Sequence, residues 1–137
     1  MGDSTENVDL YNEDKDFEIV TEFESRHQFM ELLQFNPGYV VVKLGAEWCG
    51  PCQKLHDLVD KFFNDVPKEY VVCCDIDVDE SFDLYAYLKQ KKIVTAIPAL
   101  LCYYKNNKQL IPDDVLIGAD KDQLNSFFQR CLGHISG

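Results

Sequence analysis

The sequence predicts an α/β domain with a central mixed sheet, and three features of the chain carry that prediction. Short runs of apolar and β-branched residues alternate with segments of helical periodicity, which favours parallel strands joined by helices. Near the C-terminal end, two such runs are separated only by turn-forming residues, which favours a hairpin. At 137 residues with 46% hydrophobic content, the chain suffices for one domain with its own core.

Five strands are expected in the sheet, and they comprise residues 17–21, 39–44, 70–76, 99–104 and 115–117. The runs at 39–44 and 70–76 are apolar almost throughout, which is typical of strands buried on both faces. The last two runs are separated by the turn-like segment 105–108, which indicates that they pair with each other.

Four helices are expected between and after these strands. Ser25 is placed to cap the first helix. The second helix runs from a cysteine pair, described below, to about Val66, and its apolar residues recur on one face. Asp79 or Ser81 can cap the third helix, which ends among lysines, and the last helix spans 121–132.

Composition limits where the protein acts and what it binds. Residues 1–16 are polar and acidic, so we expect a flexible tail ahead of one domain at 17–137. The formal net charge of −11 argues against unaided binding to nucleic acid or to an anionic membrane. No apolar run is long enough to span a membrane, and the N-terminus lacks the pattern of a secretory signal. These observations predict a cytoplasmic protein.

The most informative motif is Cys49-Gly50-Pro51-Cys52, which falls where a buried strand gives way to a helix. Cys49 then lies at the helix N-terminus, where unpaired N–H groups and the helix dipole favour a thiolate and lower the pKa of the thiol. A thiolate there can attack a disulfide in another molecule, and Cys52, one helical turn away, can resolve the mixed disulfide. The pair predicts a dithiol–disulfide cycle that needs no bound cofactor.

A zinc site is the alternative, because the same cysteine spacing occurs in structural zinc sites and His56 follows the pair by four residues. The sequence lacks a second cysteine or histidine pair to complete the ligands, so we expect no metal. Cys73, Cys74 and Cys102 lie on expected strands and are interpreted as buried packing residues. Cys131, near the C-terminus, is a candidate for an exposed thiol.

With these residues in view, the chain resembles the thioredoxin family. The resemblance spans about 17–132 and rests on Ala-Glu-Trp-Cys-Gly-Pro-Cys at 46–52, Ile97-Pro98, and Ile-Gly-Ala at 117–119, in the expected order. It implies the thioredoxin fold, with a mixed sheet of about five strands flanked by about four helices. It also implies a monomeric protein-disulfide reductase that acts on disulfide-containing proteins and is recharged by a thioredoxin reductase using NADPH.

The resemblance further implies a surface on which substrates dock. In the family, the proline that matches Pro98 forms a cis peptide facing the dithiol, and the backbone of the preceding residue, here Ile97, pairs with the substrate. A glycine that matches Gly118 lets the substrate backbone approach closely. The expected docking residues are Trp48, Gly50, Pro51, Ile97, Pro98 and Gly118.

One departure from the family concerns the charges beside the dithiol. Typical members carry a buried aspartate six positions before the first cysteine, where this chain has Lys43, and often a lysine on the neighbouring strand, where this chain has Asp75. Alternation along the strands puts Lys43 on the face of Val41, and Asp75 on the face of Cys73. We expect Lys43 and Asp75 to form an exchanged pair that assists Cys52; the alternative is two independent residues.

Two other functions stay open. A disulfide oxidase or isomerase has a similar cysteine pair, although Gly50-Pro51 between the cysteines resembles the reducing members of the family. A non-catalytic adaptor in a larger assembly is favoured by Lys43 and by Gly45, which stands where the family has a tryptophan. The intact dithiol argues against an adaptor.

Overall fold

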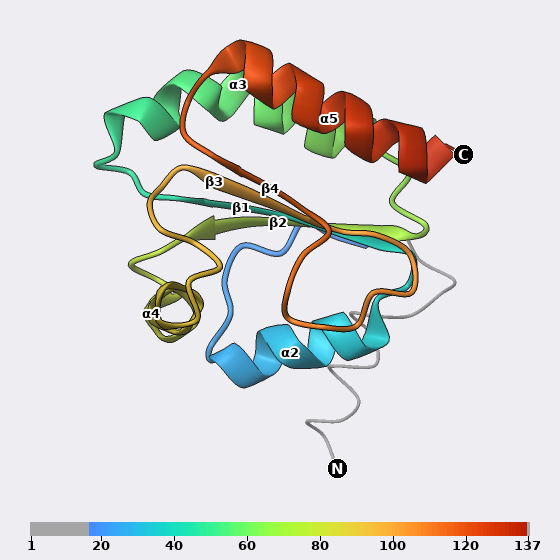
Figure 1. Ribbon diagram of the computed structural model, residues 1–137, viewed down its shortest axis with the longest axis horizontal. Helices are drawn as coiled ribbons and strands as arrows, with labels where there is room; N and C mark the ends of the chain where they lie inside the picture. Colours follow the sequence, from blue (N-terminus) through green and yellow to red (C-terminus); the bar gives the residue numbers. More distant parts are fainter. Residues whose placement is uncertain (1–16, 137) are drawn as a thin grey trace.

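Helices and strands alternate along residues 17–136, the part of the chain that the computed structural model describes. The elements, labelled as in Figure 1, are α2 (Arg26–Phe35), β1 (Tyr39–Gly45), α3 (Gly50–Asp65), β2 (Val71–Asp77), α4 (Phe82–Gln90), β3 (Ala99–Tyr103), β4 (Asp114–Ile117) and α5 (Lys121–Ser136). The flexible tail predicted for residues 1–16 lies outside the described residues. No helix within 17–136 is long and apolar enough to cross a membrane.

The described strands form one mixed sheet in the order β2-β1-β3-β4. β1 pairs in parallel with β2, and in this register Val41 lies opposite Cys73 and Lys43 opposite Asp75. β1 and β4 both pair antiparallel with β3. Helices α3 and α5 cover one face of the sheet, and α2 and α4 cover the other (Figure 1). The parallel start and the hairpin at the end are as the sequence predicts.

The predicted first strand at 17–21 is wrong for the described residues, whose sheet has four strands rather than five. Its only pairing is an isolated parallel bridge between Val20 and Cys74. Phe17 is buried, and its N–H donates to the carbonyl of Lys68, which lies before β2 begins. The segment therefore follows the outer edge of β2 without forming a continuous ladder. Its backbone bonds the loop before β2 at Phe17 and bonds β2 itself only at Val20.

The helix ends agree with the sequence in part. The Ser25 hydroxyl accepts a hydrogen bond from the Gln28 N–H at 3.4 Å, so the predicted cap of α2 is confirmed. Ser81 precedes α4 but does not cap it, because its buried hydroxyl accepts the N–H of Phe23 at 2.9 Å instead. That bond ties the segment before α2 to the segment before α4.

Two hydrophobic clusters, one on each side of the sheet, hold the layers together. Side chains from β1 alternate between them: Val40 and Val42 pack toward α2 and α4, whereas Val41 packs toward α3 and α5. Each such fully buried side chain contributes about 1.5–3 kcal/mol to folding. Cys49 and Cys52 belong to the first cluster, so the cysteine pair sits against the core rather than on a detached loop.

Candidate active site

The cysteine pair lies where the chain passes from β1 into α3. Cys49 is the residue immediately before α3, and Cys52 lies in the first turn of that helix. Their Cα atoms are 5.2 Å apart and their sulfurs are joined in a disulfide. Pro51 also occupies the first turn. Backbone N–H groups in the first turn have no partner within the helix, so the N–H that proline lacks costs no helical hydrogen bond. The predicted redox pair therefore has the geometry of a closed disulfide.

The helix N-terminus is directed at the sulfur of Cys49. The N–H of Cys52 donates to Cys49 Sγ at 3.2 Å, so the sulfur caps α3 as a hydroxyl or carboxylate does in other helices. Negative charge is stabilised at such a position by the N–H donors and the helix dipole. Cys49 is 5% exposed and Cys52 is 1% exposed, so Cys49 is the more accessible residue of the pair.

The other sequence motifs end at the same edge of the sheet. Ile97 and Pro98 are joined by a cis peptide bond immediately before β3, whose first residue, Ala99, lies opposite Leu44 near the end of β1. The N–H of Gly118 donates to the carbonyl of Pro98 at 2.9 Å. Gly118 has a φ of 117°, a conformation that favours glycine. The fold thus brings three segments that are distant in sequence to one edge (Figure 1).

The predicted docking residues differ in how far they are open to solvent. Trp48, Gly50 and Pro51 are exposed, Ile97 and Gly118 are half-buried, and Pro98 is buried. The indole of Trp48 is 70% exposed, and its N–H donates to Asp79 Oδ2 at 2.7 Å. A Cβ added to Gly50 would meet nothing within 4 Å, so the surface beside Cys49 is open.

Sequence reasoning missed the contact of Asp79 with Trp48 and considered this aspartate only as a helix cap. Asp79 lies in the loop that follows β2, and Trp48 lies in the loop that follows β1. The contact could have been predicted from the two parallel strands. Their carboxyl ends lie at the same edge of the sheet, where functional loops of α/β proteins gather, so the residues that follow the two strands lie close together.

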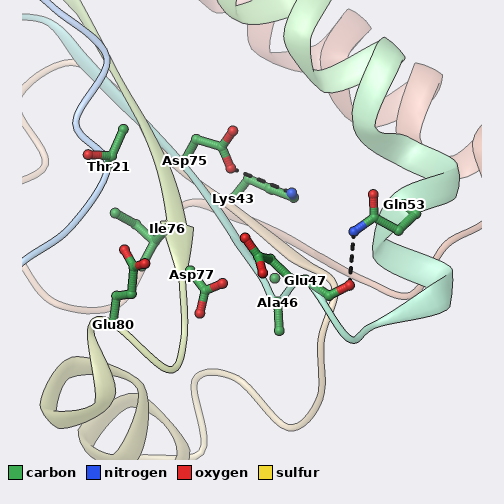
Figure 2. Close-up of a pocket in the computed structure, with 10 residues that line it drawn as sticks. Thr21, Lys43, Ala46, Glu47, Gln53, Asp75, Ile76, Asp77 and Glu80 are labelled. Carbon is green, nitrogen blue, oxygen red and sulfur yellow. Dashed lines mark hydrogen bonds and ion pairs between the residues drawn. The ribbon is translucent and has the colours of Figure 1, made fainter.

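Lys43 and Asp75 form the ion pair that the sequence predicts. Lys43 Nζ lies 3.5 Å from Asp75 Oδ1, across neighbouring strands, and Figure 2 shows the two side chains reaching toward each other. The Lys43 side chain is 11% exposed and the Asp75 side chain 39%, so only the lysine is largely withdrawn from water. The pair lines a polar pocket of about 260 Å³ that also includes the acidic residues Glu47, Asp77 and Glu80.

Gly45 makes room for the lysine beside the dithiol. A Cβ added to Gly45 would lie 3.3 Å from Lys43 Nζ and 3.3 Å from Cys52 Sγ. The ammonium and the sulfur are therefore no further apart than twice that distance. A positive charge so close favours a thiolate over a neutral thiol. A larger residue at position 45 would occupy the space that the Lys43 ammonium uses. The position of Lys43 beside Cys52 therefore depends on glycine at position 45.

The remaining cysteines lie away from this site, and one of them corrects a prediction. Cys131 is fully buried, whereas the sequence interpretation made it a candidate for exposure. Cys73, Cys74 and Cys102 are buried as predicted. Burial raises the pKa of Cys73 to about 12, and a hydrogen bond with Cys131, together with burial, raises that of Cys102 strongly. The thiols of Cys73 and Cys102 are therefore poor nucleophiles near neutral pH.

The free cysteines and the histidines do not converge on a metal site. Within residues 17–136, no three or more His, Cys, Asp or Glu side chains are grouped so as to hold a metal ion. His56, the residue that raised the zinc alternative, is exposed on α3. Redox chemistry at the cysteine pair is the activity that this arrangement of side chains can support.

Taken with the sheet order, the dithiol at the start of α3 defines a thiol–disulfide oxidoreductase of the thioredoxin fold. The thioredoxin family model matches residues 20–130. The chain therefore belongs to the thioredoxin family, as the sequence motifs predict.

Curated relatives and solved structures agree with this assignment. Thioredoxin-1 of Saccharomyces cerevisiae is 34% identical over 92 residues, which cover 67% of this chain and 82% of that protein. The chain spans about half the length of other relatives. Plasmodium falciparum Thioredoxin 3 is 31% identical to it, and the match covers 68% of this chain and 48% of that protein. The mitochondrial thioredoxin of Mus musculus is 34% identical, and the match covers 69% of this chain and 52% of that protein. A solved Plasmodium falciparum thioredoxin has a TM-score of 0.62 at 26% identity, covering 81% of this chain and 98% of that one.

Proposed function

We propose that this oxidoreductase works as a reductase of disulfides in other proteins, with Cys49 attacking and Cys52 resolving. The Cys49 thiolate attacks one sulfur of the substrate disulfide, forms a mixed disulfide and releases the other substrate sulfur as a thiolate, which takes up a proton. Cys52, as a thiolate, then attacks Cys49 Sγ, closes the Cys49–Cys52 disulfide and releases the second substrate thiol. Two electrons pass from the dithiol to the substrate.

The observation that carries this proposal is the hydrogen bond from the Cys52 N–H to Cys49 Sγ. It supports a thiolate at the residue that is also the more exposed of the two. Cys52 is almost wholly buried but lies one helical turn away, so it is protected from bulky substrates and placed to attack only Cys49. This asymmetry supports different roles for the two cysteines.

For the resolving step, we propose that Asp75 takes up or returns the proton of Cys52 through a water molecule. The pocket that Asp75 lines has room for water. Lys43 holds the carboxylate by its ion pair and, through its ammonium, stabilises the Cys52 thiolate. In this arrangement the lysine stabilises the charge on the sulfur and the aspartate is the group that exchanges protons.

Substrate docking is proposed at the edge where the motifs meet. The backbone of Ile97 pairs with the substrate chain, and Gly118 leaves space for that chain to pass. Trp48, Gly50, Pro51 and Pro98 provide the surrounding contact surface. The hydrogen bond between Gly118 and Pro98 supports this proposal, because it fixes two of the three segments relative to each other.

A thioredoxin reductase that uses NADPH is the proposed electron donor, a monomer the proposed state, and the cytoplasm the proposed compartment. Four cysteines within 17–136 are free, which is typical of a reducing compartment. Because some relatives are mitochondrial thioredoxins, imaging of the tagged protein must distinguish cytoplasm from mitochondrion.

An insulin-turbidity assay with dithiothreitol as reductant tests the proposal. We expect the protein to accelerate insulin precipitation and the Cys49→Ser variant to be inactive. The presence of Lys43 where the family has an aspartate favours the adaptor as a second candidate, and an inactive parent protein would support it. A redox titration against glutathione would separate a reductase from an oxidase or isomerase by its potential.

A further inference from the structure

Two aromatic side chains are largely exposed at the loops that follow β1 and β2, one before Cys49 and one at the start of α4. Trp48 and Phe82 are each 70% exposed, although burial of an aromatic ring stabilises a folded protein. Phe82 is the first residue of α4, and the preceding Ser81 is held inside by its bond with Phe23. The start of α4 is thereby fixed with Ser81 inside and Phe82 outside.

One short turn connects the two aromatic residues. Trp48 donates its indole N–H to Asp79, which lies three residues before Phe82. The turn itself is held by hydrogen bonds, because the N–H of Asp79 donates to Asp77 Oδ1 at 2.8 Å and the N–H of Ser81 to the Asp77 carbonyl at 3.0 Å. The turn therefore holds Asp79, the hydrogen-bond partner of Trp48, three residues from Phe82.

The surroundings of these rings are acidic. Segment 77–83 contains four carboxylates and no basic residue. Asp83 is already neutralised by Arg26 at 2.7 Å, but Glu47 and Glu80 are exposed and make no ion pair within residues 17–136. Figure 2 shows Glu47, Asp77 and Glu80 around one pocket, which they line together with Lys43. Negative charge thus accumulates next to the exposed rings.

We propose that Trp48, Phe82, Glu47, Asp79 and Glu80 form an aromatic–acidic patch that selects protein substrates. The favoured substrate carries an apolar side chain and a lysine or arginine close to its reactive cysteine. The apolar side chain packs on Phe82, and the cation is attracted both by the carboxylates and by the aromatic faces. This inference rests on the proposed reductase function and assigns Phe82 and Glu80 to substrate selection rather than to chemistry.

The test uses two peptides of equal length, each joined through its cysteine to the same small thiol. One has Leu-Arg beside the cysteine and the other has Leu-Glu. The rate constant for their reduction by the pre-reduced protein is followed by the fluorescence of Trp48. Hydroxyethyl disulfide, which is small and neutral, measures the basal chemistry. Variants Phe82→Ser and Glu80→Gln are compared with two controls at exposed positions elsewhere, Ile111→Ser and Glu69→Gln.

The controls remove equivalent groups from elsewhere on the surface. Ile111 is 69% exposed in the connection between β3 and β4, and Glu69 is exposed just before β2 begins, at the opposite end of that strand from the patch. Glu80→Gln and Glu69→Gln change the net charge equally, so a difference between them reports local attraction. Urea midpoints verify that all four variants are folded.

We expect the parent to reduce the basic peptide about ten-fold faster than the acidic one, and Phe82→Ser to lose about ten-fold on the basic peptide. Glu80→Gln should lose about three-fold at low salt and nothing at about 1 M NaCl, since exposed charges are then screened. Neither control should change these rates. Equal rates on both peptides, or equal losses in Phe82→Ser and Ile111→Ser, overturn the patch while leaving the reductase intact. If the parent fails even on hydroxyethyl disulfide, the reductase proposal fails and the patch fails with it.

Discussion

Lys43 Nζ and Asp75 Oδ1 lie 3.5 Å apart on directly opposite residues of β1 and β2, at the end of the strands where the dithiol follows. The lysine of this pair is the more buried member and lies beside Cys52. Charges that share a site in this way affect each other's energetics, so the two residues are expected to act as a unit.

Asp75→Asn should slow the resolution of mixed disulfides by about ten-fold or more, and slow the initial attack less, because only resolution needs the proton of Cys52 moved. Stopped-flow kinetics with a chromogenic substrate separates the two steps. Equal slowing of attack and resolution, or resolution at the parent rate, would show that Asp75 has no special part in resolution.

The stability of the same pair should be non-additive. Asp75→Asn leaves Lys43 without its partner, and Lys43→Ala relieves that cost in the double variant, with a coupling of about 0.5 kcal/mol or more in urea unfolding. Lys61 and Asp65 provide the control, because they form an ion pair at 3.0 Å whose side chains are 75% and 61% exposed. Their coupling should be smaller, and effects that simply add at Lys43 and Asp75 contradict the prediction.

Cysteine substitutions should have unequal effects. Cys49→Ser should abolish turnover, whereas Cys52→Ser should leave the attack intact and accumulate mixed disulfides with substrate proteins. Non-reducing electrophoresis followed by mass spectrometry detects the trapped species. If the two variants trap partners equally, the assignment of Cys49 as nucleophile is wrong.

Trp48 should report the redox state directly, since it is the only tryptophan and precedes Cys49. Its emission should change when dithiothreitol opens the disulfide, because the change occurs next to an exposed ring that donates a hydrogen bond to Asp79. The double variant with serine at positions 49 and 52 should give no response. A response that persists in that variant would assign the signal to another process.

The pair of Arg26 and Asp83 should make part of the stability pH-dependent. The guanidinium of Arg26 hydrogen-bonds the carboxylate, as does the Arg26 N–H, and these bonds lower the pKa of Asp83 to about 2. The folded pKa is below the unfolded value of about 3.9, so the pair stabilises the fold above about pH 4 and loses its effect as the pH falls toward 2.

Asp83→Asn should therefore lower the urea midpoint at neutral pH, with a difference from the parent that shrinks below about pH 4. A difference that is constant with pH, or an Asp83 carboxyl that titrates near pH 4 by NMR, would contradict this account.

The sequence predicted those features that depend on short-range patterns. The opposition of Lys43 and Asp75 follows from the two-residue alternation of strands once the strands are paired. The position of Cys49 follows from a strand that ends shortly before a glycine and a proline suited to a first helical turn.

What the sequence did not predict depends on longer-range packing. The segment around Val20 has a strand-like pattern, but only its position relative to β2 decides that it forms a single bridge. Cys131 falls in the last turn of the predicted helix 121–132, where exposure is expected, whereas α5 continues to Ser136 and Cys131 is buried. Cys131 lies seven residues after the buried Leu124, on the same inward face, so the helical period alone would have placed it in the core.

The burial of the four free cysteines has a practical consequence for chemical labelling. With the roles proposed above, an alkylating reagent or a thiol resin added to the reduced, folded protein is expected to react first at Cys49, the more exposed residue of the pair. The unaltered chain would then be immobilised or tagged at one defined atom without first removing its other cysteines. Substrates captured on that atom would be recovered by reductant with little background from the interior thiols.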